Sequence, residues 1–367
     1  MTNGQSLPVS GKDHTASTTD AAGTKIWKGA LIGIGFMGRV HLAQYQRMER
    51  EGAPVRLQAI CDIDARKFDN VFVEGNLNES FERIDFSPYR LYTDIGELLE
   101  REELDFVDIA LPTDLHAATA IRAMERGLHV LCEKPMALGA DEASAMAQTS
   151  ARTGTTLMVA QVLRFWPAYE YLKNCTEQRR YGDTLAATFF RGGDTPVWSH
   201  DNWMLREARS GGSLLDQHVH DVDLINWLYG QPESVSCVGR NVLPGSGYDI
   251  VSTHYRYADG KVVLAQDDWT LKGAFGFEMS YRVNFERGCL VFEHGILTDY
   301  PAEGEAIKPE LDEDAGFYRE LRYFVEILSA GDEPERCMPA DTLGTIRIAE
   351  AELASARKQG EWVAVSI

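Results

Sequence analysis

Asp216 and His220 lie four residues apart in the segment GGSLLDQHVH, where a helix is expected over residues 214–229. Side chains four apart share one helix face, so the carboxylate can orient the imidazole and raise its pKa. Such a pair is suited to general base chemistry, in which the imidazole takes a proton from a hydroxyl group. We predict His220 as the base and Asp216 as its orienting partner and a substrate ligand. A structural histidine with a carboxylate partner is the plainer alternative.

The same segment offers metal-ligand types, since His218, Asp221 and Asp223 lie close to His220. However, residues two apart point about 200° from one another on a helix, so the two histidines cannot face one ion there. We therefore predict no metal site.

A glycine-rich loop, GIGFMG over residues 33–38, joins an apolar run at residues 30–34 to a helix expected over residues 40–50. The first glycine permits a tight turn, the second lets the backbone approach a pyrophosphate, and the third lets helix pack on strand. The helix N-terminus adds free N–H groups for the phosphates. The loop predicts dinucleotide binding through Gly33, Gly35, Phe36, Met37 and Gly38.

Asp62 ends the next apolar run, residues 55–61. A carboxylate there can accept hydrogen bonds from a ribose diol and would repel a 2′-phosphate, which favours NAD over NADP. Arg66 and Lys67 lie close by and weaken that preference. A glycine turn followed by a surface aspartate is the plainer alternative.

Two more motifs follow apolar strands, LPTDLH at residues 111–116 and Glu133-Lys134-Pro135. Ligands of open α/β sheets bind at this carboxyl edge. The chain resembles the Gfo/Idh/MocA family, the glucose–fructose oxidoreductase and inositol dehydrogenase group. The resemblance rests on these two motifs, the glycine loop, Arg164-Phe165 with Pro167, and Gly211-Gly212 with Asp216 and His220. The resemblance covers most of the chain from Ile26 onward. It is specific for the family and not for a substrate.

The resemblance implies that Lys134 lies between the nicotinamide and the reacting hydroxyl, with Glu133 near the nicotinamide ribose. An ammonium in that place would stabilise a developing alkoxide. The peptide bond before Pro135 is expected to be cis, and the family uses the same Asp–His pair. The cofactor contacts expected outside the glycine loop are Asp62, Leu111, Pro112, Thr113, His116, Glu133 and Lys134.

Tryptophans and arginines stand in stretches that could line a substrate cleft. Aromatic faces and forked guanidinium groups suit sugars, although core tryptophans and surface arginines are an equally plain explanation. The predicted substrate ligands are Arg164, Trp166, Trp203, Asp216 and His220, and Trp198 and Arg206 are in the same stretches.

The elements that must position these residues form two patterns. Strand–helix alternation predicts a doubly wound parallel Rossmann sheet, and the later run of successive strands predicts an α+β unit with a mostly antiparallel open sheet. We predict a flexible arm (1–25), an NAD-binding domain (26–150) and a substrate-binding and oligomerisation domain (151–367). Strands at 251–257 and 262–271 carry apolar residues on both faces, which predicts a homodimer or homotetramer through this sheet.

Composition excludes several partners. The 367 residues carry a net charge of −20, which repels nucleic acid and anionic lipid. No apolar run reaches membrane-spanning length, no secretory signal is visible, and none of the six cysteines forms a CxxC pair. We expect a cytoplasmic protein with reduced thiols.

These features predict an NAD-dependent oxidoreductase that transfers a hydride between nicotinamide and a secondary hydroxyl or ketone of a sugar, glycoside or cyclitol. One alternative is an enzyme that retains its cofactor and cycles between two sugars, such as a glycoside 3-dehydrogenase. Another is a non-catalytic NAD-binding redox sensor, although a sensor needs none of Lys134, Asp216 and His220.

Overall fold

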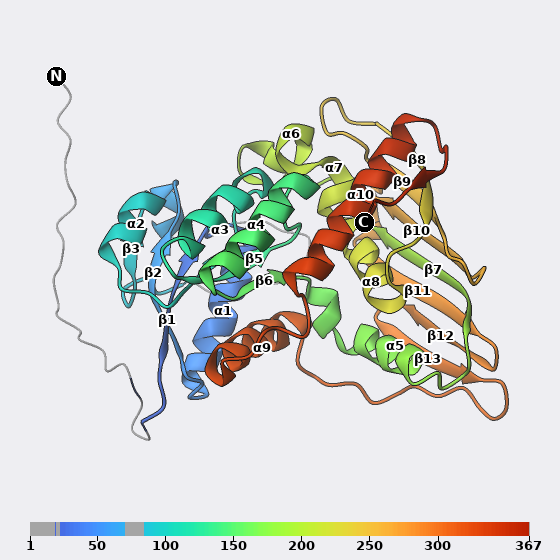
Figure 1. The fold of residues 1–367 in the computed structure, drawn as a ribbon, viewed down its shortest axis with the longest axis horizontal. Coiled ribbons are helices and arrows are strands. Elements are labelled where there is room, and N and C mark those ends of the chain that lie inside the picture. Colours follow the sequence, from blue (N-terminus) through green and yellow to red (C-terminus); the bar gives the residue numbers. More distant parts are fainter. Residues whose placement is uncertain (1–18, 20–22, 70–83, 367) are drawn as a thin grey trace.

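The chain forms two β-sheets with helices packed around them (Figure 1). This computed structural model describes residues 19, 23–69 and 84–366. The flexible arm predicted for residues 1–25 falls almost wholly outside the described residues. Among the described residues, no helix combines the length and apolar character needed to cross a membrane.

The first sheet is six-stranded and parallel, in the order β3-β2-β1-β4-β5-β6. Because the strand order reverses between β1 and β4, a crevice for a ligand is expected outside their carboxyl ends. The last strand, β6, belongs to this sheet although it lies after residue 150, where the first domain was predicted to end. The strands are β1 (Trp27–Ile32), β2 (Val55–Cys61), β3 (Arg90–Tyr92), β4 (Phe106–Ile109), β5 (His129–Glu133) and β6 (Leu157–Ala160).

Helices cover both faces of this sheet. One face packs on α2 (Ile95–Arg101), α3 (His116–Met124) and α4 (Ala140–Thr153), and the other on α1 (Phe36–Arg50) and α9 (Gly316–Ala330). α9 comes from near the end of the chain, and its fully buried Phe324 ring meets the Phe106 ring of β4 edge-on, with centroids 5.5 Å apart. A segment assigned by sequence to the second domain therefore completes the core of the first.

The second sheet has eight strands in the order β13-β12-β11-β7-β10-β9-β8-β14. Every neighbouring pair is antiparallel except β7 and β10, so the predicted mostly antiparallel sheet is confirmed. The central strand β7 was not predicted. The strands are β7 (Thr184–Gly192), β8 (Ser234–Arg240), β9 (Ile250–Arg256), β10 (Val262–Asp268), β11 (Glu278–Phe285), β12 (Gly288–Glu293), β13 (Ile296–Pro301) and β14 (Val363–Ala364).

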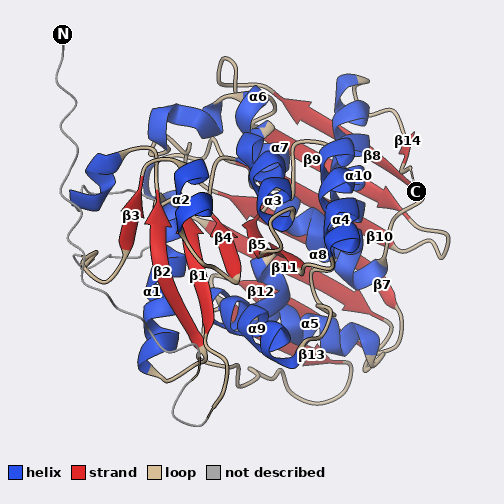
Figure 2. Cartoon of the chain, turned by 60° about the vertical axis from the view of Figure 1, so that its left-hand side comes forward, coloured by secondary structure: helices blue, strands red, loops and turns tan. Residues whose placement is uncertain are grey.

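Helices pack on one face of the second sheet, and no described element covers the other (Figures 1 and 2). They are α5 (Pro167–Glu177), α8 (Val219–Tyr229) and α10 (Pro339–Arg357), with α10 also packed on α4 of the first domain. Two short helices, α6 (Glu207–Ser210) and α7 (Gly212–Asp216), lead into α8. The single long helix predicted over residues 214–229 is wrong, because the chain breaks at residues 217–218.

Candidate active site

The glycine loop has the backbone geometry that a dinucleotide requires. Gly33 has φ +98°, and a Cβ there would lie 2.3 Å from the carbonyl oxygen of Ala110. A Cβ on Gly38 would lie 2.0 Å from the oxygen of Gly33, whereas a Cβ on Gly35 would meet nothing within 4 Å. The middle glycine thus opens to free space at the start of α1, whose first turn holds no acidic residue. The loop fits a bound pyrophosphate.

Asp62 lies beside this loop, as predicted, but its carboxylate already has partners. Oδ2 accepts a hydrogen bond from the Ile34 N–H at 2.9 Å and meets Lys67 Nζ at 2.7 Å, and Oδ1 accepts from the Asp64 N–H. Asp62 therefore braces the loop, and its predicted contact with the adenosine ribose stays a prediction. Lys67 is the neighbouring cation that could instead meet a 2′-phosphate.

The loop after β4 is tied to the loop after β5. The buried His116 ring lies between two carbonyl oxygens, 2.8 Å from that of Leu111 and 2.8 Å from that of Pro135. Lys134-Pro135 is a cis peptide, as the resemblance implied. Because His116 is enclosed, its observed role is to hold the two cofactor-edge loops together, while Leu111 and Pro112 keep partly exposed surface.

Lys134 crosses from the first domain to the second. Its Nζ donates a hydrogen bond to the backbone oxygen of Asp216 at 2.7 Å and lies 3.5 Å from Asp216 Oδ1. Both side chains are nearly buried, with 14% and 11% of their surfaces exposed. The structure thus brings together two of the three predicted catalytic residues.

The positive charge of Lys134 also acts on His220, but His220 has no hydrogen bond to Asp216. Asp216 ends α7 while His220 lies in the first turn of α8, so the predicted shared helix face does not exist. The buried His220 Nδ1 has no hydrogen-bond partner among the described residues. Burial, and then the positive charges of Lys134 and Arg191, hold the pKa of His220 well below its usual value. The predicted rise in pKa is therefore wrong, and the imidazole is neutral at neutral pH.

The other metal-ligand types in this segment, His218, Asp221 and Asp223, each have a buried partner. His218 Nε2 is 3.3 Å from Glu352 Oε2, Asp221 pairs with Arg191, and Asp223 pairs with Arg164. No group of His, Cys, Asp and Glu in the described part of the chain has the arrangement of a metal site.

Arg164 does not reach a cleft. Its guanidinium is fully buried and bidentate to Asp223, with both N–O distances 2.8 Å, and a third contact reaches Asp341. The prediction that Arg164 binds substrate is wrong, because a guanidinium without exposed surface cannot contact a substrate. Trp166 and Trp203 are half-buried, and Trp166 packs edge-on against Phe317 beside the glycine loop.

Replacing Arg164 by methionine should destabilise the fold and leave the cofactor site intact. The change leaves Asp223 as an unpaired buried charge, which costs about 3–5 kcal/mol. The control is Arg322→Ala, which breaks the exposed Arg322–Glu326 pair and should cost at most about 0.5 kcal/mol. Urea unfolding measures both, and a loss for Arg164→Met below about 1 kcal/mol would contradict the structural role.

A buried polar group that was not predicted lies beneath the cofactor edge. His41 of α1 lies between Asp108 of β4 and Glu133 of β5, and Glu320 of α9 is enclosed nearby. The available signal was a charged residue inside an otherwise apolar strand, the aspartate of FVDI.

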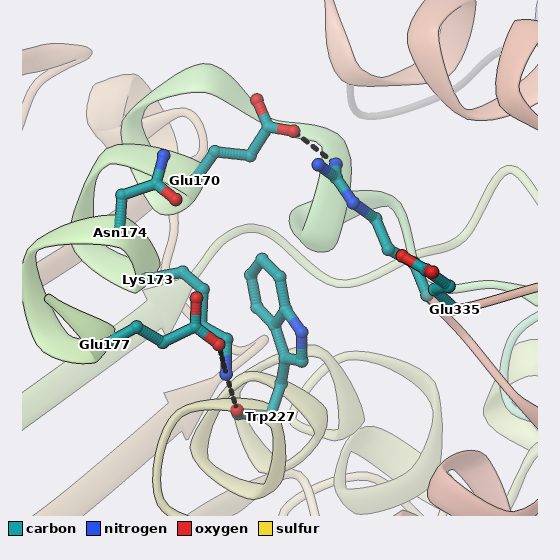
Figure 3. A pocket seen from close by; sticks show the side chains of 7 residues that line it. Glu170, Lys173, Asn174, Glu177, Trp227 and Glu335 are labelled. Atoms are coloured by element: carbon teal, nitrogen blue, oxygen red, sulfur yellow. Dashed lines mark hydrogen bonds and ion pairs between the residues drawn. The ribbon is translucent and has the colours of Figure 1, made fainter.

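A separate hollow of about 240 Å³ lies between α5, α8 and the segment before α10 (Figure 3). The Trp227 ring stands among its lining side chains. Its carboxylates Glu170 and Glu177 are paired with Arg336 and Lys173. No predicted site residue lines it, so it is not assigned to the reaction.

The parallel sheet carries a dinucleotide loop and a lysine at one edge, and the open-sheet domain adds a carboxylate and a neutral imidazole. This combination defines the class of two-domain nicotinamide-linked oxidoreductases. Comparison with models of known protein families supports the same class. The model described as the GFO/IDH/MocA oxidoreductase family, NAD-binding Rossmann fold, matches residues 27–161, and that of the GFO/IDH/MocA C-terminal domain matches residues 169–291. The chain belongs to the Gfo/Idh/MocA oxidoreductase family, and its first domain is that family's NAD-binding fold.

Relatives of known name are similar in sequence over different portions of this chain. Levoglucosan dehydrogenase of Pseudarthrobacter phenanthrenivorans is 30% identical over 58% of this chain and 54% of its own length. D-apiose dehydrogenase of Paraburkholderia graminis is 26% identical over 94% of this chain and 90% of its own. The solved complex of levoglucosan dehydrogenase with NADH and levoglucosan has a TM-score of 0.80 and 22% identity, covering 93% of this chain and all of that one. Several curated relatives are matched over only 54–60% of their length.

Proposed function

We propose that this chain is an NAD-dependent oxidoreductase acting on a secondary hydroxyl or ketone of a sugar, glycoside or cyclitol. The observation that carries the proposal is the contact of Lys134 with Asp216 at the carboxyl edge of the parallel sheet, where the positive charge of Lys134 also acts on His220. An ammonium and a neutral imidazole at one place can stabilise an alkoxide and accept its proton.

In the oxidative direction, His220 takes the hydroxyl proton on a ring nitrogen while the Lys134 ammonium stabilises the oxygen left behind. His220 is ready for this because its low pKa keeps it unprotonated at neutral pH. Asp216 holds the Lys134 ammonium in place through its backbone oxygen and its carboxylate. NAD, when bound, supplies the acceptor for the carbinol hydride. The reverse reaction uses the same groups.

The substrate class rests on the names of the relatives and on two side chains. Levoglucosan and D-apiose dehydrogenases are carbohydrate enzymes by name. The half-buried Trp166 and Trp203 are aromatic faces on which a sugar ring can pack. These features favour a carbohydrate without choosing among sugars.

The test begins with mass spectrometry of any cofactor carried through purification. Titration of cofactor-free protein should then show at least a tenfold preference for NAD over NADP, about 1.4 kcal/mol. A panel of sugars, glycosides and cyclitols is monitored at the nicotinamide absorbance. A tenfold preference for NADP would overturn the NAD assignment, and failure of the whole panel with either cofactor would overturn the substrate class. Turnover only with paired sugars would identify a cofactor-retaining cycle.

We also propose that two copies associate through the outer face of the eight-stranded sheet. On β10, Val263 and Ala265 are buried against the helices, whereas Val262 is 60% exposed and Leu264 half-buried on the outer face. An apolar sheet face of this kind needs a cover.

Leu264→Glu should therefore convert the assembly to monomers, because it places a charge in the centre of the covered face. Light scattering at micromolar concentration measures the mass. Leu91→Glu on β3 of the other sheet, which also alters a partly exposed leucine, is the control and should leave the assembly unchanged. A monomeric wild-type protein would refute the association.

A further inference from the structure

A buried histidine lies between two carboxylates directly beneath the cofactor edge. His41 Nδ1 is 2.9 Å from Asp108 Oδ2, and its Nε2 is 3.1 Å from Glu133 Oε1. Asp108 and Glu133 come from the adjacent strands β4 and β5. All three side chains are buried, so water does not screen these contacts.

Glu133 continues the same line of contacts toward the reacting residues. Its second oxygen, Oε2, accepts a hydrogen bond from the Lys134 backbone N–H at 3.0 Å. Lys134 in turn holds the backbone oxygen of Asp216. A continuous path therefore runs from Asp108 through His41 and Glu133 to the residue expected to face the nicotinamide.

The charges along this path support one another. Burial alone would raise the pKa of Glu133, but the close approach and charge of His41, followed by the charge of Lys134, lower it. Burial alone would lower the pKa of His41, yet Asp108 and Glu133 raise it well above its usual value. His41 is thus an imidazolium and Glu133 a carboxylate at neutral pH.

Other titratable groups surround the pair. Glu320 has no hydrogen-bond partner among the described residues, and burial with nearby negative charges raises its pKa, so it is a neutral acid. The groups coupled electrostatically to His41 or Glu133 from the packed elements are Asp108, Cys132, His116, Lys134 and Glu320, and Tyr45 acts on the same group through Asp108.

We propose that His41 is a positioning residue for the cofactor, holding the Glu133 carboxylate ionised and turned so that it accepts a hydrogen bond from a nicotinamide-ribose hydroxyl. The inference rests on the proposed function for the cofactor alone and not for the sugar. A buried carboxylate without a counterion takes up a proton, and a protonated acid loses part of its capacity to accept.

The test is the affinity for NADH, measured by its fluorescence from pH 6 to 9. The wild-type profile should be flat. In His41→Gln the pKa of Glu133 rises, so NADH binding should be about tenfold weaker at pH 6 and recover toward pH 9. Glu133→Gln should be about tenfold weaker at every pH. The double variant should match Glu133→Gln, since His41 acts through that carboxylate.

His218→Gln is the matched control, because it removes another fully buried histidine–glutamate pair, with Glu352, away from the glycine loop. Its NADH profile should stay flat and tight. A flat, tight profile for His41→Gln would overturn the proposal, as would a double variant tenfold weaker than Glu133→Gln. If His41→Gln does not fold, wild-type affinity in Glu133→Gln overturns it independently. Failure of sugar oxidation would leave this titration unaffected.

Discussion

His220→Ala should lower turnover by about 10²- to 10⁴-fold, because it removes the group that accepts the hydroxyl proton. Behind this expectation is the low pKa of His220, to which the positive charge of Lys134 contributes and which leaves the imidazole neutral. Steady-state turnover on the active sugar measures the effect. The affinity for NADH should change little, since the glycine loop and Asp62 lie elsewhere.

The pH dependence provides a second check on His220. Its pKa is depressed in the folded protein, so the unprotonated base is fully present above the usual histidine pKa of about 6.5 and is lost only as the pH falls through the lower folded value. The wild-type kcat/KM should therefore show no loss from His220 between pH 9 and 7. Near-full turnover of His220→Ala across pH 6 to 9 would mean that Lys134 or a water is the base.

Lys134→Ala should lower turnover by about two to three orders of magnitude, because the developing oxyanion loses its positive partner. Asp216→Asn tests whether the Asp216 carboxylate is needed to hold Lys134. The strongest contact of Lys134 is with the backbone oxygen of Asp216, which the substitution retains, so this variant should lose much less.

Rate measurements at saturating sugar, with NADH affinity alongside, separate a lost catalytic group from a lost cofactor. The double variant Lys134→Ala, His220→Ala should be far from additive, because groups that act together fail together. Full multiplication of the two losses would show that they act independently. A Lys134→Ala protein with wild-type turnover would remove this lysine from the mechanism.

The parallel sheet was largely predictable, because strands buried on both faces are continuous apolar runs. Val55–Cys61 matches its predicted limits, and β1, β4, β5 and β6 differ from theirs by a few residues at their ends, whereas the short edge strand β3 was not predicted. β7 escaped because Thr184–Gly192 contains two adjacent alanines and a buried arginine, Arg191, which obscure the alternation. Its place at the centre of the sheet comes from pairing with β10 and β11, far along the chain.

The contacts of the candidate site could not be predicted from the sequence. The motifs named Lys134, Asp216 and His220, but the bond between Lys134 and Asp216 uses a backbone oxygen that no side-chain type encodes. The sequence could not distinguish the buried Arg164 from a sugar-binding arginine, because its partner Asp223 lies 59 residues further along the chain. The break between α7 and α8 likewise arises from tertiary packing on β9 and β10.

The place of α9 has a consequence for the order in which the molecule can be assembled. The apolar surface shared by Leu31, Tyr45 and Phe106 is covered in large part by residues of α9, which begins at Gly316. During synthesis the six parallel strands leave the ribosome long before that helix exists, and domains otherwise fold from the N-terminus as they emerge. The cofactor domain must wait with one flank open to water until nearly the whole chain has been made. A fragment ending at Ala160 would keep that flank exposed permanently, so this cofactor-binding half is not a portable unit.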